Sequence, residues 1–565
     1  MAKVISIGNQ SFESIREKNN FYIDKTNFIR EWWDNDDTVT LITRPRRFGK
    51  TLNMSMLECF FSNKYKDRGD LFEGLEIWND EKYRKLQGTY PVIFLSFAEI
   101  KQNNYNDAVE KIKRIICEVC QQFDFLKNWD GLTEIEKKNI SNISYNMSDV
   151  MAQDLIKNMS NYLSRYYGKK VIILLDEYDT PMQEAYVNGY WEELVAFTRS
   201  LFNSTFKTNP YLERAIMTGI TRVSKESIFS DLNNLKVITV TSDEYSKCFG
   251  FTEDEVFAAL DEQGLSSEKE KVKLWYDGFT FGDEKDVYNP WSIINFLDEK
   301  KYKTYWADSS SNGLVNELIR TGSAEIKKTM ETLIAGGTVE KNIDEQIVVE
   351  QLKTNKDAVW SLLLASGYLR VETFRTEGRL NKKIYSLKLT NYEVEQMFGT
   401  MIERWFGGAD VPYNEFINAM LNGDIESMNE YMNRVTRGVI SYFDTGKTPS
   451  DEEPERFYHG LVLGLMVEQV DNYILNSNRE SGYGRYDIML EPIDKTNEKY
   501  PGIVIEFKVI NPRKENTLEE TVAAALKQIE EKNYDAELVK RGVKEENIHH
   551  YGFAFRGKEV LIDGR

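Results

Sequence analysis

The hydrophobic pattern of the first 300 residues alternates short β-branched runs with longer stretches of helical periodicity, which is typical of an α/β layer fold. Several runs are continuously apolar, as expected for parallel strands that are buried on both faces of a sheet. The polar, helical segment 104–167 is predicted to be a surface insertion. The predicted strands are Thr38–Thr43, Pro91–Phe97, Lys170–Leu175, Arg214–Thr218 and Val237–Thr241.

Beyond about residue 250 the pattern becomes mainly helical. One piece has the order helix then hairpin, as in winged-helix domains: Ala358–Leu369, then Arg370–Thr373 and Tyr385–Leu389. The polar segment 444–454 contains two prolines and is the best predicted linker. After it, a small α/β domain is predicted with the elements Arg456–Asn476, Tyr486–Leu490, Gly502–Val509, Thr521–Lys532 and His550–Phe555.

Composition narrows the class of protein. Hydrophobic residues make up 41% and charged residues 29% of the 565 residues, which is typical of globular domains with apolar cores. No apolar run approaches the roughly 18 residues that a membrane span needs. The N-terminus lacks the layout of a signal peptide, so a cytoplasmic protein is expected. Four cysteines and three histidines argue against a disulfide framework and a zinc site, and Cys117 and Cys120 are predicted to face a core.

The net charge of −19 argues against a protein that coats nucleic acid through bulk charge. It does not exclude a nucleic-acid enzyme, because such enzymes concentrate positive charge locally and bind metal ions with carboxylates. The last 111 residues contain 20 acidic and 16 basic side chains, so that part of the chain is not basic either.

A strand, a loop and a helix follow one another around Arg44-Pro45-Arg46-Arg47-Phe48-Gly49-Lys50-Thr51. This order forms an anion cradle from backbone N–H groups and the helix dipole. Gly49 would let the backbone approach a phosphate, Lys50 would bridge the β- and γ-phosphates, and Thr51 would bind Mg²⁺. A full P-loop has a glycine where this chain has Arg44.

Two acids, Asp176 and Glu177, end the apolar strand at 170–175. In P-loop ATPases with a catalytic glutamate, the first acid holds Mg²⁺ and the second polarises water, although such a pair can also cap a helix. The next strand leads to Thr218 and Arg222, either of which could contact the γ-phosphate. The alternative is that Thr218 only completes hydrogen bonds at the end of its strand and that Arg222 is an exposed surface residue.

Segment 41–51 has four basic residues and no acid. Arg46 and Arg47 could therefore bind phosphates, or contact a neighbouring subunit or nucleic acid.

A second group of polar residues lies in the last domain. Strand alternation puts Glu506 and Lys508 on one face, and a neighbouring strand brings Asp487 alongside. Two carboxylates and a lysine suit Mg²⁺-assisted phosphodiester cleavage. An acid from the preceding helix would complete the site, with Glu455 better placed than Glu468.

Gln528 and Tyr534 on the next helix are expected to support this group. An exposed surface pair is the alternative for Glu506 and Lys508, but the apolar flanks of their strand favour a site.

Taken together, these residues resemble a bacterial AAA-ATPase-like family whose members end in a PD-(D/E)XK nuclease-superfamily domain. The matching segments extend from about residue 22 to about residue 509 and keep their order: FYIDKTNFI, LITRPRRFGKTLNMSML, VIILLDEYDTPM, MTGITRVSKESIFSDLNNLK, LWYDGFTFG, VYNPWSII, ERFYHGLVLGL, GRYDIML and IVIEFKV.

The resemblance implies an α/β fold in four parts. A P-loop NTPase domain with an AAA/ASCE-like parallel sheet would occupy 1–250, and a helical lid with a winged-helix-like region would occupy 251–443. The linker 444–454 would lead to a restriction-endonuclease-like domain at 455–565.

The same resemblance implies ATP and Mg²⁺ as cofactors. The expected nucleotide contacts are Arg46, Arg47, Phe48, Gly49, Lys50, Thr51, Asp176, Thr218 and Arg222. The expected catalytic residues are Glu177, Asp487, Glu506 and Lys508. The expected metal ligands are Thr51, Asp176, Glu455, Asp487 and Glu506. For Tyr22, Asp24 and Lys25, packing beneath the nucleotide base is one hypothesis.

The leading prediction is an ATP-dependent enzyme that cuts nucleic acid, with DNA expected in preference to RNA and no membrane partner. The alternative is a nucleotide-dependent switch whose last domain binds nucleic acid or a partner without cutting it. A homo-oligomer or an unidentified protein partner is compatible with both.

Overall fold

The computed structural model describes residues 3–220, 228–229, 232–307, 309, 315, 318–319, 324–334, 336–343, 358–378, 382–406, 413–439, 472–477, 480–481, 484–485, 487–497, 499–511, 515–556 and 559–565. The chain forms two compact units: Met1–Ser309 with Glu340–Val394, and Ser310–Val339 with Glu395–Arg565. Within the described ranges, no helix combines the length and apolar character that crossing a bilayer requires.

The first unit is built around a five-stranded parallel sheet in the order β2-β3-β4-β1-β5. All five strands were predicted, and four of them are shifted by no more than two residues at either end. β4 lies between β1 and β3, so the carboxyl ends of these three strands meet at one edge. The strands are β1 (Val39–Thr43), β2 (Val92–Ser96), β3 (Val171–Asp176), β4 (Leu212–Gly219) and β5 (Leu235–Ile238).

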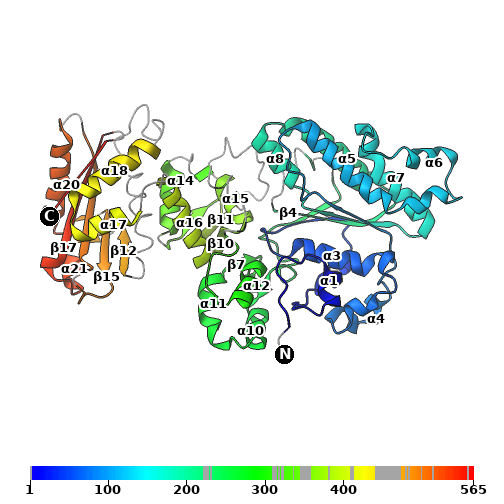
Figure 1. Ribbon diagram of the computed structural model, residues 1–565, viewed down its shortest axis with the longest axis horizontal. Helices are drawn as coiled ribbons and strands as arrows, with labels where there is room; N and C mark the ends of the chain where they lie inside the picture. The colour runs from blue at the N-terminus through cyan, green and yellow to red at the C-terminus, as the bar shows by residue number, and fades with distance from the viewer. Residues whose placement is uncertain are drawn as a thin grey trace. The chain divides into compact units, whose positions relative to one another are not determined.

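Helices cover both faces of this sheet (Figure 1). Alternation along β3 explains how, because Ile173 and Leu175 belong to one apolar cluster while Ile172 and Leu174 belong to the other. One layer contains α5 (Tyr105–Gln121), α7 (Asp149–Tyr167), α8 (Thr180–Asn188) and α9 (Trp191–Phe202). The opposite layer contains α1 (Phe12–Glu17), α2 (Asn27–Asn35), α3 (Lys50–Phe61) and α4 (Glu81–Arg84).

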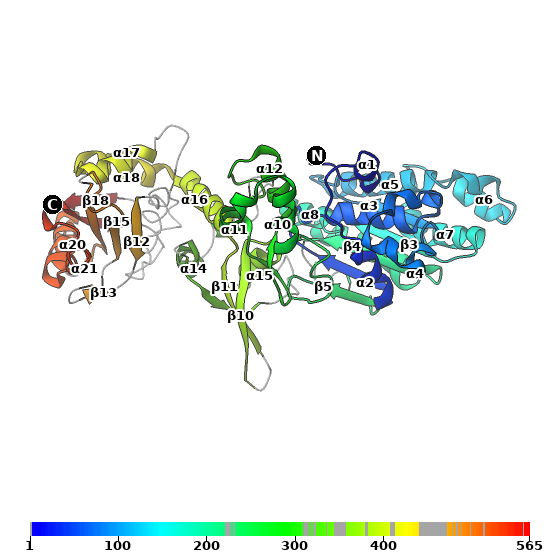
Figure 2. The same cartoon turned by 90° about the horizontal axis from the view of Figure 1, so that it is seen from below.

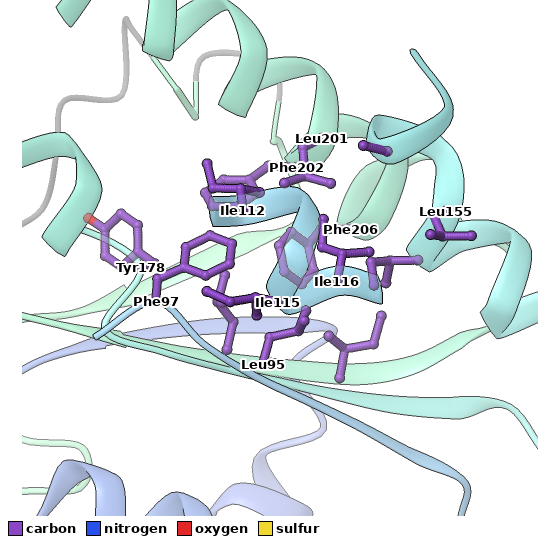
Figure 3. Packing of buried hydrophobic residues seen from close by; sticks show 14 of the residues in the cluster. Leu95, Phe97, Ile112, Ile115, Ile116, Leu155, Tyr178, Leu201, Phe202 and Phe206 are labelled. Carbon is purple, nitrogen blue, oxygen red and sulfur yellow. The ribbon is translucent and has the colours of Figure 1, made fainter. Parts of the chain in front are cut away.

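Segment 104–167 is helical as predicted, but α5 is part of the core rather than a surface insertion. Ile112 and Ile116 on α5 are at most 1% exposed and pack with Leu95 of β2 and Phe202 of α9 (Figure 3). The strongly amphipathic helix covers the sheet with its apolar face, and its polar face accounts for the polar composition. Cys117 and Cys120 are buried free thiols, so the prediction of a core-facing pair is confirmed. α6 (Glu134–Ser141) follows in this segment.

The middle region is mainly helical, as predicted, with two small sheets. Its described elements within the first unit are β6 (Phe251–Thr252), α10 (Glu253–Glu262), α11 (Lys269–Tyr276), β7 (Phe279–Phe281), β8 (Glu284–Tyr288), α12 (Pro290–Glu299), α15 (Ala358–Ala365), β10 (Leu369–Glu377) and β11 (Lys382–Leu389). Helix α15 followed by the β10–β11 hairpin confirms the helix-then-hairpin prediction. Strand β9 (Val339–Lys341) and helices α14 (Ala324–Ile334) and α16 (Tyr392–Phe406) complete the region.

The second unit contains a mixed sheet in the order β12-β15-β16-β17-β18, in which β16 and β17 are parallel and the other pairs antiparallel. Its strands are β12 (Tyr473–Ser477), β15 (Ile488–Pro492), β16 (Gly502–Val509), β17 (Ile548–Arg556) and β18 (Glu559–Gly564), with the short pair β13 (Glu480–Ser481) and β14 (Gly484–Arg485) beside them. One face packs on α17 (Tyr413–Asn422) and α18 (Ile425–Val439), and the other on α20 (Leu518–Lys532) and α21 (Ala536–Lys540).

One predicted element of this unit is wrong at its end. The helix predicted for Arg456–Asn476 cannot reach Asn476, because Tyr473 to Ser477 pair antiparallel with β15. The Tyr473 hydroxyl donates to the carbonyl of Pro501 at 2.9 Å and anchors this strand in the core. Segment 456–471 and the predicted linker 444–454 lie outside the described residues.

Candidate functional sites

The phosphate loop connects β1 to α3. Gly49 precedes the first residue of α3 with φ of 79°, and a Cβ there would meet nothing within 4 Å. Lys50 Nζ donates to the backbone carbonyls of Arg44 (2.9 Å) and Pro45 (2.8 Å). Burial lowers the pKa of Lys50, and the ion pairs of the described residues include none for its ammonium group. A buried cation beside the amino end of a helix fits a phosphate group.

The residues predicted to bind Mg²⁺ are in direct contact. The Thr51 hydroxyl, at the start of α3, donates to Asp176 Oδ2 at 2.7 Å. The other oxygen of Asp176 accepts from the Thr218 hydroxyl at the end of β4. Burial raises the pKa of Asp176, and these two hydrogen bonds oppose that effect. A hydroxyl and a carboxylate side by side are the hard oxygen donors that Mg²⁺ prefers, so these residues fit the metal.

Glu177 directly follows β3 and has a left-handed backbone with φ of 50°. Its N–H donates to the Thr218 hydroxyl at 3.3 Å, and its side chain accepts from the Thr180 hydroxyl at 3.2 Å. The carboxylate is half-buried, at the edge where β1, β3 and β4 end. It is therefore held beside the phosphate loop without being closed off from water.

Asp179 is a member of this site that the sequence did not single out. It is 1% exposed and accepts from the N–H of Ile220 at 2.9 Å and from the Gln183 amide at 3.0 Å. A Cβ on Gly219 would lie 2.8 Å from Asp179 Oδ1, so the glycine permits this close approach. Asp179 thereby fixes the chain just after Thr218. Arg222, predicted nearby, lies outside the described residues.

The second group of polar residues gathers on β15, β16 and α20. Asp487 Oδ2 accepts from the N–H of Phe507 at 2.8 Å, which places Asp487 between Glu506 and Lys508 along β16. Glu506 is 4% exposed and accepts from the amide of Gln528. The Gln528 oxygen in turn accepts from Lys508 Nζ at 2.7 Å. Glu506 and Lys508 thus lie on one face, as predicted, with Lys508 Nζ 4.0 Å from Glu506 Oε1.

Close packing of α20 makes this arrangement possible. Glu506 is in register with Gly552 of β17, where a Cβ would lie 2.9 Å from the carbonyl of Val522. The glycine therefore lets α20 lie against the sheet, and Gln528 reaches Glu506. The Gln528 amide also contacts the Tyr534 hydroxyl at 3.2 Å, so both predicted supporting residues join the group. On the opposite face, Phe507 packs on Phe553 with ring centroids 5.1 Å apart.

Two adjacent carboxylates fit a divalent cation by their chemistry, but they are only part of a ligand set. No cluster of three acidic, imidazole or thiol side chains able to hold a metal ion occurs within the described ranges. The third ligand predicted here, Glu455, and its alternative Glu468 lie outside those ranges.

Family models match the two parts of the chain that contain these groups of residues. A family model described as a predicted AAA-ATPase matches residues 6–229, which include the phosphate loop and the acids that follow β3. A model of the PD-(D/E)XK nuclease superfamily matches residues 453–564, which include Asp487, Glu506 and Lys508. The chain joins a predicted AAA-ATPase domain to a PD-(D/E)XK nuclease-superfamily domain. An Azotobacter chroococcum mcd 1 protein named "Uncharacterized protein in vnfD 5'region" is 24% identical over 396 residues, 70% of this chain and 68% of that protein.

The predicted AAA-ATPase domain has Arg44 where a full P-loop has glycine. The side chain is completely buried and donates to the carbonyls of Thr43 (3.0 Å) and Thr239 (2.6 Å). Its guanidinium lies 4.5 Å from the centroid of the Phe281 ring, and burial lowers the pKa of Arg44 to about 10. The loop is therefore anchored by a side chain at a position where glycine would supply flexibility.

The remaining loop residues contact the middle region. The Arg46 carbonyl accepts from Trp306 Nε1 at 3.0 Å, and the Arg47 guanidinium lies 4.3 Å from the Trp291 ring centroid. Phe48 is buried against Phe279, so only its backbone can approach a phosphate. The Arg46 side chain is half-buried, close enough to disfavour protonation of Lys50.

The side chains of Tyr22, Asp24 and Lys25 contact other segments of the protein. Lys25 Nζ forms a partly buried ion pair with Glu255 at 2.7 Å, which joins the N-terminal segment to α10. Asp24 accepts from the N–H groups of Thr26 (2.8 Å) and Glu76 (2.7 Å). The Tyr22 hydroxyl is buried, and burial raises its pKa well above the ordinary value. These contacts support a packing role, and contact with a nucleotide base stays a prediction.

Glu393 is a second residue that the sequence did not indicate. It accepts from the Ser292 hydroxyl at 2.8 Å and from the N–H of Trp306 at 2.6 Å, so it orients the residue that holds the Arg46 carbonyl. Burial raises the pKa of Glu393 from 4.5 to about 7. The folded state therefore retains a proton that the unfolded state loses between these values.

This proton makes the stability of the first unit, which contains Glu393, pH-dependent. The contribution of Glu393 to the unfolding free energy should fall as pH rises from about 4.5 to about 7, by about 3 kcal/mol in total. Glu393→Gln should remove that pH dependence, so the unfolding free energy of the variant relative to wild type should increase as pH rises. Urea unfolding of both proteins at pH 5 and pH 8 measures the difference. Parallel pH dependence of the two would show that Glu393 does not titrate in this way.

Proposed function

We propose that the N-terminal domain binds and hydrolyses ATP and that the C-terminal domain cleaves nucleic acid with a divalent metal ion. The observation that carries this proposal is that one chain brings together two groups of side chains of the types that bind phosphate and divalent metal. One joins Lys50, Thr51 and Asp176 at the sheet edge, and the other joins Asp487, Glu506 and Lys508.

In the ATPase domain, the N–H groups at the start of α3 would bind the β-phosphate, and Lys50 would turn from its loop carbonyls to the β- and γ-phosphates. Thr51 and Asp176 would hold Mg²⁺, which when bound neutralises phosphate charge. Glu177 would orient and polarise the attacking water, and Thr218 would keep Asp176 and Glu177 in register. Arg46 is a further candidate for contact with the γ-phosphate.

In the nuclease-superfamily domain, Asp487 and Glu506 would hold a divalent metal, which when bound activates water and offsets charge on the phosphate. Lys508, positioned by Gln528, would steady the developing negative charge or orient the nucleophile. Glu455 is the proposed additional ligand. The nucleic acid is proposed to be DNA in preference to RNA, and assays on both distinguish them.

Glu177→Gln tests the hydrolytic half. The amide keeps the size of the side chain but cannot polarise water, so turnover should fall by roughly 10²- to 10⁴-fold while ATP stays bound. Steady-state phosphate release and equilibrium ATP affinity measure the two effects. Glu192→Gln, an exposed acid on α9, is the matched control and should leave both unchanged. Unaltered turnover in Glu177→Gln would remove this residue from the mechanism.

A nucleotide-dependent switch without cleavage is the second candidate. It is favoured by the two-carboxylate metal site within the described residues and by the acidic balance of the last 111 residues. Divalent-metal-dependent cleavage of single- and double-stranded substrates by wild type would decide for the nuclease. ATP binding with negligible turnover, and nucleic-acid binding that survives Glu506→Ala, would decide for the switch.

A further inference from the structure

The β10–β11 hairpin extends away from the helices of the middle region (Figure 2). Leu369, Leu387 and Leu389 at its base are buried, whereas every residue from Thr373 to Glu377 is exposed. On the partner strand, Tyr385 is 4% exposed, so the solvent-exposed side chains of the distal half belong mainly to β10 and to the end of β11. In the three-stranded sheet of order β10-β11-β9, β10 is an edge strand, so its distal residues face solvent.

The hairpin is basic in an acidic protein. Segment 369–389 contains six basic and two acidic residues, although the whole chain has a net charge of −19. Arg370 pairs with Glu372, and Arg375 with Glu377 and with Glu340 of β9.

The lysines of the hairpin differ from these arginines. The ion pairs of the described residues include none for Lys382, Lys383 or Lys388. Lys382 and Lys383 are exposed at the distal end, whereas Lys388 is half-buried near the base. The accessible positive charge therefore lies at the distal end.

An exposed aromatic ring lies beside this charge. Phe374 is 55% exposed and pairs across the strands with Tyr385, with ring centroids 5.8 Å apart. Lys383 Nζ lies 5.5 Å from the centroid of the Phe374 ring on the same face. Proteins that bind single-stranded nucleic acid combine the same two features, because bases stack on aromatic rings while ammonium groups contact phosphates.

We propose that Phe374, Lys382 and Lys383 form a surface that binds single-stranded nucleic acid. The inference rests on the proposed function for the nature of the partner and adds where that partner is held. Charge complementarity selects a polyanion, and the exposed ring selects one whose bases are unstacked. An acidic protein surface would use the lysines but would have no planar base to cover Phe374.

The test uses the full chain and a labelled single-stranded oligonucleotide, without divalent metal so that no cleavage occurs. Replacing both Lys382 and Lys383 by glutamate should weaken binding at least about tenfold and reduce the slope of log affinity against log salt by about 2. Phe374→Ala should weaken binding by about tenfold with the slope unchanged. The matched control is the double change Lys300→Glu and Lys301→Glu, which alters the charge equally at two exposed lysines.

The outcomes separate this inference from the proposed function. If wild type binds and both hairpin variants bind as the control does, the hairpin surface is refuted and nucleic-acid binding stands. If wild type binds no nucleic acid, both the hairpin surface and the proposed action on nucleic acid are refuted. Equal losses on single strands and on duplex would refute the preference for unstacked bases. Unchanged thermal unfolding of each variant shows that the hairpin change has not unfolded the domain.

Discussion

Lys50→Ala is expected to weaken ATP binding by at least ~100-fold, corresponding to about 2.7 kcal/mol. The ammonium group is buried beside the N-terminus of α3 and donates to the loop carbonyls of Arg44 and Pro45 at 2.9 and 2.8 Å. Binding of a triphosphate would exchange these neutral acceptors for charged oxygens, a stronger interaction that alanine cannot make. Isothermal titration with ATP and Mg²⁺ measures the loss.

Two controls make the Lys50 result interpretable. Lys85→Ala removes a lysine that is 72% exposed in the same unit, and it should bind ATP as wild type does. Because the Lys50 side chain is buried and donates to two loop carbonyls, urea unfolding of the variant beside wild type shows whether the fold is retained. An unchanged ATP affinity in a folded variant would refute the assignment of the loop.

Glu506→Gln is expected to reduce metal-dependent cleavage by roughly 10³-fold or more and to leave ATP turnover unchanged. The acid is 4% exposed, and the amide can still accept from Gln528, so size and packing are conserved. What is lost is the negative charge of one of the two carboxylates proposed to bind the metal, and a neutral amide is a weaker ligand for a hard cation. Cleavage rates at saturating Mg²⁺ measure the effect.

The matched control for Glu506 is Glu531→Gln, an acid that is 63% exposed on α20 of the same domain. This variant should cleave nucleic acid at the wild-type rate. Asp487→Asn should reproduce the Glu506→Gln phenotype, because Asp487 is held beside the same strand by the N–H of Phe507. Equal cleavage by wild type and by both active-site variants would place the activity elsewhere or in a contaminant. Loss of ATP turnover together with cleavage would indicate tight coupling of the domains.

Much of both sites could be predicted because their residues follow strand ends or alternate along one strand. Asp176 and Thr51 are far apart in the sequence, yet a parallel sheet brings every carboxyl strand end to one edge. The same regularity puts Glu506 and Lys508 on one face. The order of the strands, with β4 between β1 and β3, carries no local signal, but it gives Thr218 its contacts with both acids.

The parts that could not be predicted depend on contacts between distant segments. Arg44 departs from the P-loop pattern, and the neighbouring sequence gives no sign that its guanidinium contacts Thr239 and Phe281. Glu393 is one acid at the start of a helix, and its partner Ser292 is 101 residues away. The local pattern predicts a helix as far as Asn476, because the partner that makes Tyr473–Ser477 a strand is β15, which comes later in the chain.

The most direct test of an ATP-binding chain with a nuclease-type site is one cleavage measurement on three proteins. Wild type, Glu506→Gln and Lys50→Ala are each incubated with Mg²⁺ and single- or double-stranded DNA or RNA, with and without ATP. We predict cleavage by wild type, none by Glu506→Gln under any condition, and loss of any ATP effect in Lys50→Ala. No cleavage by folded wild type under every condition would contradict the account and favour the nucleotide-dependent switch.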